Sequence, residues 1–268
     1  MTTITEQPPV HRNLESKKIE EITSLINIEN AAVAKAIDAA LPQINNLIYA
    51  IVEKLKGGGR MFYLGAGSGG RLSVLDVIEL PTTFGIEKGM VNTILAGGIE
   101  HLVEAREEME DNFNEGWERL ANETVTTKDI VVGISASGTT PFVLGALETC
   151  RKNNITTGCI VSNPESPIAG HADYPVEIIT GPEFIAGSTR MKCGTAQKMI
   201  FDMISTTLMI QLGRVEDNQM VHVKLINKKI TDRAVKILMG RAGITSYDEA
   251  RKLLLEYGSV KNALDHLK

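Results

Sequence analysis

The sequence predicts an α/β protein built on a doubly wound parallel β-sheet, with helices before the sheet and a small helical tail after it. Five short apolar runs show little alternation between apolar and polar residues, which is typical of parallel strands buried on both faces. Segments with helical spacing of apolar residues separate several of these runs. Two loops rich in glycine and serine follow the first and third runs, where a parallel sheet places its binding site.

The expected strands are residues 60–64 (RMFYL), 91–95 (VNTIL), 129–134 (DIVVGI), 157–161 (TGCIV) and 175–179 (PVEII). Two or three helices should precede them, because apolar residues recur at helical spacing from Ser16 and Pro42 suits a helix start. Further helices are expected over residues 100–111, 141–152, 195–212 and 221–239, followed by a short pair at the end of the chain.

The chain divides into three expected regions. Residues 1–45 form an N-terminal arm and helices, residues 46–220 form the sheet domain, and residues 221–268 form a C-terminal helical region. The first dozen residues are polar and contain two adjacent prolines, so we expect an extended or disordered arm there.

Composition excludes several classes of function. A net charge of -5 with interspersed signs, and only six Phe, five Tyr and one Trp, give no surface for nucleic acid. The three cysteines are far apart, which argues against a disulfide framework or a zinc site. The sequence shows neither a signal peptide nor a membrane span, so we expect a cytoplasmic protein that contacts no membrane.

The two glycine and serine loops are residues 65–70 (GAGSGG) and 135–140 (SASGTT). Glycine lets the backbone approach an anion closely, and the N–H groups of a helix start and serine hydroxyls donate hydrogen bonds to it. Either loop alone could be an ordinary tight turn, but two such loops after strands of one sheet favour a phosphate site. The first loop also matches G-x-G-x-x-G, but no acidic residue ends the next strand, as a dinucleotide site requires.

Three longer stretches identify a family resemblance. The segments GAGSGGRL…DVIELPTTFG, SASGTTPFV and GPEFIAGSTRMKCGTAQKMIFDMISTTLM resemble the N-acetylmuramic acid 6-phosphate etherases, which have the sugar isomerase (SIS) fold. The resemblance implies a flavodoxin-like SIS sheet, a sugar phosphate ligand, and a homodimer whose sites are completed across the interface. It extends to glucokinase regulatory proteins, which bind sugar phosphates without chemistry.

The etherase reaction eliminates D-lactate from the open-chain sugar phosphate and adds water, which gives N-acetylglucosamine 6-phosphate without a metal or organic cofactor. By position in the motifs, the resemblance implies that Glu79 is the acid and Glu110 the base. It further implies a set of substrate contacts, with the phosphate held by the second loop: Gly67, Ser68, Ser135, Ser137, Gly138, Thr140, Ser188 and Lys192.

Ordinary structural roles compete with these assignments. Glu79 could be an exposed residue at a helix end before Pro81, and Glu110 lies in an acidic stretch that is typical of a solvated face. Ser188 could cap a helix. Neither His101 nor His222 is expected to be catalytic, because no serine or cysteine nucleophile accompanies them.

We therefore expect a sugar-phosphate etherase, with a non-catalytic sugar-phosphate regulator or a phosphosugar isomerase as alternatives. The family usually has Thr-Ser where this chain has Ser68-Gly69, and Arg where it has Thr139. These differences bear on which sugar is bound more than on the elimination chemistry.

Overall fold

The computed structural model describes residues 3–104 and 106–267. Its centre is a five-stranded parallel sheet in the order β2-β1-β3-β4-β5, the flavodoxin-like order, which confirms the expected fold class. The strands are β1 (Met61–Gly65), β2 (Val91–Leu95), β3 (Ile130–Ser135), β4 (Thr156–Val161) and β5 (Tyr174–Glu177). Each strand lies within two residues of its expected position.

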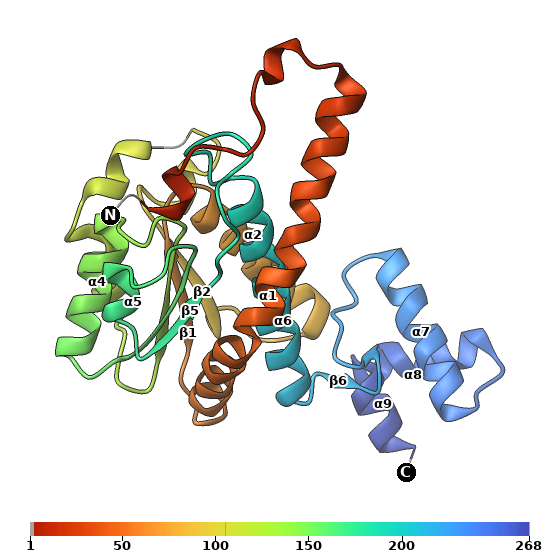
Figure 1. The fold of residues 1–268 in the computed structure, drawn as a ribbon. Coiled ribbons are helices and arrows are strands. Elements are labelled where there is room, and N and C mark those ends of the chain that lie inside the picture. Colours follow the sequence, from red (N-terminus) through yellow and green to blue (C-terminus); the bar gives the residue numbers. More distant parts are fainter. Residues whose placement is uncertain (1–2, 105, 268) are drawn as a thin grey trace. The chain divides into compact units, whose positions relative to one another are not determined.

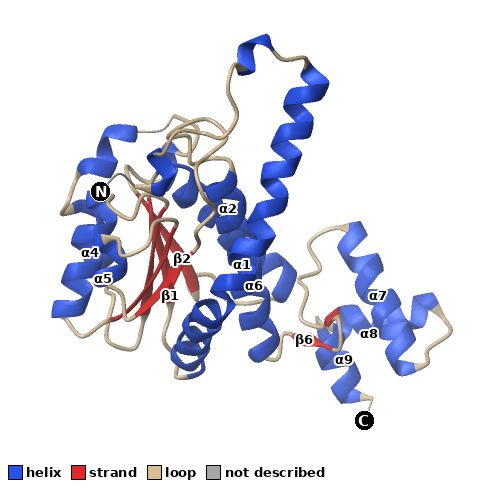
Figure 2. Cartoon of the chain, viewed as in Figure 1, coloured by secondary structure: helices blue, strands red, loops and turns tan. Residues whose placement is uncertain are grey.

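Helices flank this sheet on both faces (Figure 2). The α-helices are α1 (Ile19–Lys56), α2 (Gly67–Phe84), α3 (Glu115–Asn122), α4 (Pro141–Lys152), α5 (Pro167–Gly170), α6 (Lys192–Gln211), α7 (Lys228–Ala242), α8 (Tyr247–Tyr257) and α9 (Val260–His266). Short 3-10 turns are η1 (Ile4–Glu6), η2 (Leu14–Ser16), η3 (Ile99–His101) and η4 (Glu107–Asp111), and strands β6 (Val215–Glu216) and β7 (Gln219–Met220) form a small hairpin.

The described chain folds into two compact units, and the first consists of the segments up to Leu75 and Met90–Ile204. In this unit α4 and α5 cover one face of the sheet, while α1 and α6 lie over the other (Figure 1). Phe142 belongs to the core on the α4 side, and Tyr63 contacts Phe201 of α6 with ring centroids 4.9 Å apart on the opposite side. Burial on both faces explains why the strand sequences lack alternation.

The second unit consists of Asp76–Gly89 and Ser205–Lys268. Helices α7, α8 and α9 surround a small apolar core that includes Val221, Leu238 and Leu254, each fully buried. Ser205 donates a hydrogen bond of 2.9 Å to the buried carboxylate of Asp76. The apolar residues that recur at helical spacing in the C-terminal sequence thus pack against one another within this unit.

Two expectations about the helices were wrong, and one helix was missed. A single helix of 38 residues, α1, replaces the two or three expected before the sheet, and Pro42 lies inside it. Proline lacks only one N–H, and the apolar face of α1 against the sheet continues on both sides of it, so tertiary packing outweighs that loss. In place of the helix expected over residues 100–111, the described residues form the 3-10 turns η3 and η4, because Gly97 and Gly98 have positive φ and closely spaced acidic residues repel one another in a helix. The helix α3, which no pattern indicated, follows instead.

The N-terminal arm is ordered where the structure describes it. Residues 3–18 contain the two turns η1 and η2, and Thr5 is fully buried. Apart from these two short turns, the described part of the arm forms no helix or strand, which agrees with the expectation of an extended arm. Within the described residues, no helix combines the length and apolar character that crossing a membrane requires.

Candidate active site

A cleft of about 210 Å³ opens at the carboxyl ends of β1 and β3. Both glycine and serine loops line it, together with residues from the arm, from the 187–189 turn and from α6. The polar lining comes from Glu6, Ser68, Glu110, Ser135, Ser137, Thr140, Thr189 and Gln197. The loops that follow parallel strands meet at this edge of the sheet, so the position of the cleft agrees with that expected for a ligand site.

The second loop forms a compact array of hydroxyl groups around Ser135. Its Oγ lies 2.8 Å from Thr140 Oγ1 and 3.3 Å from Ser137 Oγ, and it accepts a 3.0 Å hydrogen bond from the Gly138 N–H. Ser137 Oγ in turn accepts hydrogen bonds from the N–H and the hydroxyl of Thr139. The loop therefore presents several hydroxyl groups held by one another, at the N-terminus of α4, which attracts anions.

The turn in this loop requires glycine at residue 138. Gly138 has φ +76°, and a Cβ atom there would lie 2.3 Å from the Cβ of Ser166. Ser166 is the N-cap of α5 and accepts a hydrogen bond from Ala169 N. A side chain at residue 138 would therefore distort both the loop and the start of α5.

Gly65 of the first loop ends β1, and the other three glycines, Gly67, Gly69 and Gly70, lie in the first turn of α2 and not in a loop before it. A Cβ at Gly70 would lie 2.6 Å from Leu95 and 2.8 Å from the backbone of Gly65, while one at Gly69 would lie 2.7 Å from Ile134. Because these glycines have no side chains, the start of α2 can lie in direct contact with the ends of β1, β2 and β3. The N-terminus of α2, like that of α4, is part of the cleft.

Glu110 lies beside the start of α2. A Cβ at Gly67 would be 4.0 Å from Glu110 Oε2, and Gly67 itself has φ +53°. Partial burial raises the pKa of the Glu110 carboxyl, the nearby charges of Glu107 and Asp111 raise it further, and Arg71 opposes them. A carboxylate whose pKa is raised toward neutrality has the property that a general base needs.

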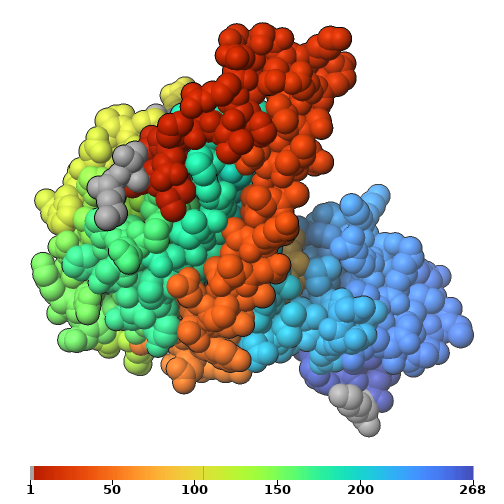
Figure 3. Space-filling model, viewed as in Figure 1, coloured from red at the N-terminus to blue at the C-terminus, as the bar shows by residue number. Residues whose placement is uncertain are grey.

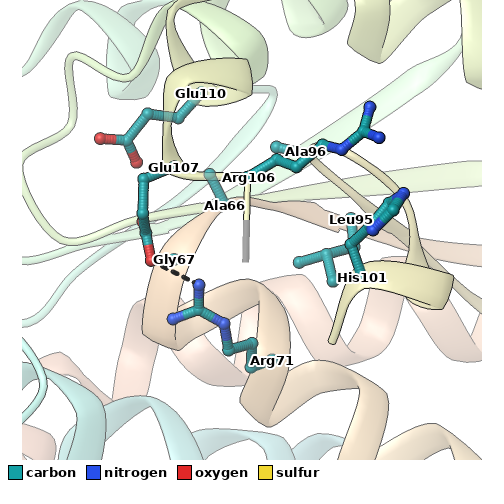
Figure 4. Close-up of a pocket in the computed structure, with 9 residues that line it drawn as sticks. All are labelled: Ala66, Gly67, Arg71, Leu95, Ala96, His101, Arg106, Glu107 and Glu110. Atoms are coloured by element: carbon teal, nitrogen blue, oxygen red, sulfur yellow. Dashed lines mark hydrogen bonds and ion pairs between the residues drawn. The ribbon is translucent and has the colours of Figure 1, made fainter. Parts of the chain in front are cut away.

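A second, smaller pocket shares Gly67 and Glu110 with the cleft (Figure 4). Arg71, from the second turn of α2, donates a 2.6 Å hydrogen bond to Glu107 there, and Arg106 and His101 complete its polar wall. Figure 4 shows the Arg106 and His101 side chains on the side of the pocket away from the Arg71–Glu107 ion pair.

Known proteins resemble this chain in amino-acid sequence over almost its whole length. An N-acetylmuramic acid 6-phosphate etherase from Bacteroides fragilis is 49% identical over 99% of this chain and 94% of its own. One from Porphyromonas gingivalis is 50% identical over 99% of this chain and 96% of its own. This chain belongs to the N-acetylmuramic acid 6-phosphate etherase family. Family models match in the same region: the glucokinase regulatory protein N-terminal SIS domain at residues 43–151 and the SIS domain at residues 114–206.

Solved structures extend the likeness to the fold. A phosphoheptose isomerase from Francisella tularensis has a TM-score of 0.55 at 18% identity and covers 74% of this chain and all of its own. A phosphoheptose isomerase from Neisseria gonorrhoeae has a TM-score of 0.53 at 13% identity, over 70% of this chain and 97% of its own. At these identities the likeness shows the SIS fold alone.

The residues that the etherase family motifs single out do not all line the cleft. Glu79 is exposed on α2, twelve residues after Gly67, which is about 18 Å along a helix that rises 1.5 Å per residue. The helix continues through Pro81 to Phe84, so Glu79 does not mark a helix end. Ser188 and Lys192 are not among the cleft residues, although Gly187 and Thr189 are.

Lys192 has a structural environment of its own. Its side chain is 4% exposed, and its Nζ lies 2.6 Å from Glu29 Oε2 of α1. The carboxylate of Glu183, almost fully buried, accepts hydrogen bonds of 2.9 Å from the N–H groups of Lys192 and Cys193 and thereby caps the start of α6. Lys192 and Glu183 therefore have structural roles at the start of α6, which follows the turn that carries Gly187 and Thr189.

Two residues that line the cleft, Gln197 and Glu6, were not predicted from the sequence. Gln197 of α6 is 3% exposed and approaches the start of α2, where a Cβ at Gly69 would lie 2.9 Å from its Oε1. Glu6 comes from the arm and lines the cleft although it lies far from every motif. Among the described residues, no group of three or more His, Cys, Asp or Glu side chains is arranged to hold a metal ion.

Proposed function

We propose that this protein eliminates D-lactate from N-acetylmuramic acid 6-phosphate and adds water to give N-acetylglucosamine 6-phosphate. The observation that carries the proposal is the position of Glu110, whose carboxylate has a raised pKa and lies beside the α2 N-terminus in the cleft. Identity of 49–50% to etherases over almost the full chain supports the same reaction.

The phosphate occupies the hydroxyl array of the second loop. No Lys or Arg of the described chain lines the cleft, so the donors are the hydroxyls of Ser135, Ser137 and Thr140 with the N–H groups at the start of α4. Hydrogen bonds from neutral donors to a dianion are charge-assisted and strong. Two helix N-termini add favourable partial charge, which substitutes for a formal cation.

Glu110 removes the proton from carbon 2 of the open-chain sugar, which is acidic because it is alpha to the aldehyde. The electron pair forms the carbon 2–carbon 3 double bond as the carbon 3–oxygen bond breaks, and an acid protonates the departing lactate oxygen. Addition of water to the unsaturated aldehyde then completes the reaction. The raised pKa makes Glu110 a stronger base than an ordinary carboxylate.

We assign the acid to Glu79 of a second subunit in a homodimer. Glu79 is exposed on α2, about three helical turns after the helix start that lines the cleft. A single chain therefore does not place both Glu79 and Glu110 at its cleft. On the same part of α2, Leu75 is 43% and Ile78 is 62% exposed. Exposed apolar side chains beside an acid suit a surface that another subunit covers.

Reduced thiols support a cytoplasmic location for this reaction. Cys150, Cys159 and Cys193 are free and buried, and burial raises the pKa of each thiol to about 12. Such thiols are unreactive and suit a reducing compartment.

A lactate-release assay on purified protein tests the proposal. N-acetylmuramic acid 6-phosphate should yield lactate and N-acetylglucosamine 6-phosphate, whereas N-acetylmuramic acid without the phosphate should not. Binding without lactate release, and without exchange of the carbon 2 proton in deuterated water, would instead support a regulator, which the glucokinase regulatory protein match makes the second candidate. Conversion of a sugar phosphate to a ketose would support an isomerase.

A further inference from the structure

Glu6 reaches the cleft from the beginning of the chain. It ends the turn η1, in which the Glu6 N–H donates a 3.1 Å hydrogen bond to Thr3 O, and it lines the cleft together with Ser135, Ser137 and Thr189. Figure 3 shows the N-terminal arm, in red, lying across the green-to-teal part of the chain. The arm is therefore part of the wall of the cleft.

The neighbouring residue Thr5 anchors the arm to the second loop. Thr5 is fully buried, its N–H donates to Asn163 Oδ1 at 3.3 Å, and its Oγ1 accepts from Asn163 Nδ2 at 3.0 Å. The same Nδ2 donates to the carbonyls of Ala136 and Ser137 at 3.0 and 3.1 Å. One amide thus links the arm to the backbone of the hydroxyl array, and the position of Glu6 relative to that array is defined.

A second attachment holds the arm further along. His11 Nε2 lies 3.1 Å from Glu29 Oε1 of α1, and the His11 ring is tilted against Phe184 with centroids 5.5 Å apart. Because the arm is fixed on both sides of Glu6, little conformational freedom remains to be lost when a ligand contacts it.

Gly187 makes room for the Glu6 carboxylate. A Cβ atom at residue 187 would lie 3.1 Å from Glu6 Oε2, and Gly187 has φ +70°. The glycine turn and the arm carboxylate therefore fit together at the rim of the cleft. This contact gives a reason for glycine at a position that the sequence marks only as part of a motif.

The charge of Glu6 does not suit the phosphate. Glu6 and Glu110 are the two charged residues among those lining the cleft, and both are acidic. Like charges repel, so an anionic phosphate is not the group that Glu6 receives. A carboxylate without a cationic partner in the cleft instead accepts hydrogen bonds from neutral hydroxyl groups, which a sugar carries along its carbon chain, away from its anionic phosphate.

We propose that Glu6 is a substrate-binding residue whose carboxylate accepts hydrogen bonds from hydroxyl groups of the bound sugar. The hydrogen bonds between Thr5 and Asn163 hold Glu6 in this position. The inference rests on the proposed function, because it requires a sugar phosphate as the ligand. It adds a specificity determinant from the arm to a site otherwise formed by the sheet domain.

Isothermal titration of the full chain with two probes tests this role. For N-acetylglucosamine 6-phosphate, Glu6→Ala should weaken binding by about 10- to 100-fold, the loss expected for a hydrogen bond to a charged group. For inorganic phosphate, the same variant should bind as tightly as the wild type or more tightly, because a repelling charge is gone. Glu15→Gln, an exposed carboxylate on the same arm and outside the cleft lining, is the matched control and should change neither affinity.

Thr5→Val provides a second route to the same result. It removes the hydroxyl that accepts from Asn163 but keeps the side-chain volume, so it should loosen the arm and weaken binding of the sugar phosphate without altering Glu6 itself. Circular dichroism should show wild-type folding for both variants.

Three results would overturn the inference. In the first, Glu6→Ala binds N-acetylglucosamine 6-phosphate as tightly as the wild type. In the second, it weakens both probes equally, which would make Glu6 a support for the phosphate loop and not a sugar contact. In the third, wild-type protein binds inorganic phosphate but no sugar phosphate. Only this third result would also contradict the proposed function, so the experiment distinguishes failure of the inference about Glu6 from failure of the proposed function.

Discussion

Replacement of Glu110 by glutamine tests the assignment of the base most directly. Glutamine keeps the size of the side chain beside Gly67 but cannot accept the carbon 2 proton. A positioned base contributes about 10²- to 10⁴-fold, so both carbon 2 exchange and lactate release should fall by that factor. The corresponding rise in the activation barrier is about 3–5 kcal/mol.

The same substitution should not destabilise the fold. Burial and the charges of Glu107 and Asp111 raise the pKa of Glu110 in the folded state above its ordinary value of 4.5. A carboxyl whose pKa is raised by folding lowers stability above the folded-state pKa and has no such effect below the unfolded-state value. Glu110→Gln should therefore be at least as thermally stable as the wild type at neutral pH, with the advantage disappearing under acid conditions.

Proton NMR of N-acetylglucosamine 6-phosphate in deuterated buffer measures the exchange, and an enzymatic lactate assay measures the elimination. Glu108→Gln is the control, because it removes an exposed carboxylate from the same turn, η4, that does not line the cleft. Glu79→Gln should behave differently from Glu110→Gln, with lactate release lost and exchange retained. Full exchange by Glu110→Gln would refute the assignment of this residue as the base.

Three further predictions concern the pH response, the phosphate site and the assembly. The value of kcat/KM should fall as pH falls through the pKa of Glu110, so its acid limb should lie above the ordinary 4.5, and an acid limb at or below that value would contradict the raised pKa. Ser137→Ala should weaken sugar-phosphate binding by about 1–3 kcal/mol in titration calorimetry, and unchanged affinity would exclude a direct contact. Ile78→Asp, on the exposed α2 surface, should convert a dimer into an inactive 29.1 kDa chain in light scattering, whereas an active wild-type monomer would reject shared sites.

The sheet could be predicted from the sequence because most of its strands are short, largely apolar runs. The strands at residues 61–65, 91–95, 130–135 and 156–161 are buried along almost their whole length. Helix α4 was equally clear, because Pro141 occupies its first position and the apolar spacing continues to Lys152. Local patterns sufficed where local sequence and burial agree.

Prediction failed where distant contacts decide the structure. Pro42 suggested a helix start, but packing of α1 on the sheet carries the helix through it. Nothing near Glu6 in the sequence indicates a binding residue, because its position depends on Asn163 and Gly187, both more than 150 residues away. Glu110 was singled out by resemblance alone, since its acidic neighbours resemble a solvated face until Gly67 is seen beside it. These residues acquire their roles only from the tertiary fold.

The absence of Lys and Arg from the described lining of the cleft also affects how a ligand arrives. The chain carries a net charge of -5, and the charged residues that line the cleft are both carboxylates. A dianionic sugar phosphate therefore approaches against the field of the protein, and short-range hydrogen bonds hold it only after it has entered. Dissolved salt screens such repulsion over about 10 Å at 0.1 M. Association should accordingly become faster as ionic strength rises, the reverse of the behaviour of enzymes that attract anions through a cationic funnel.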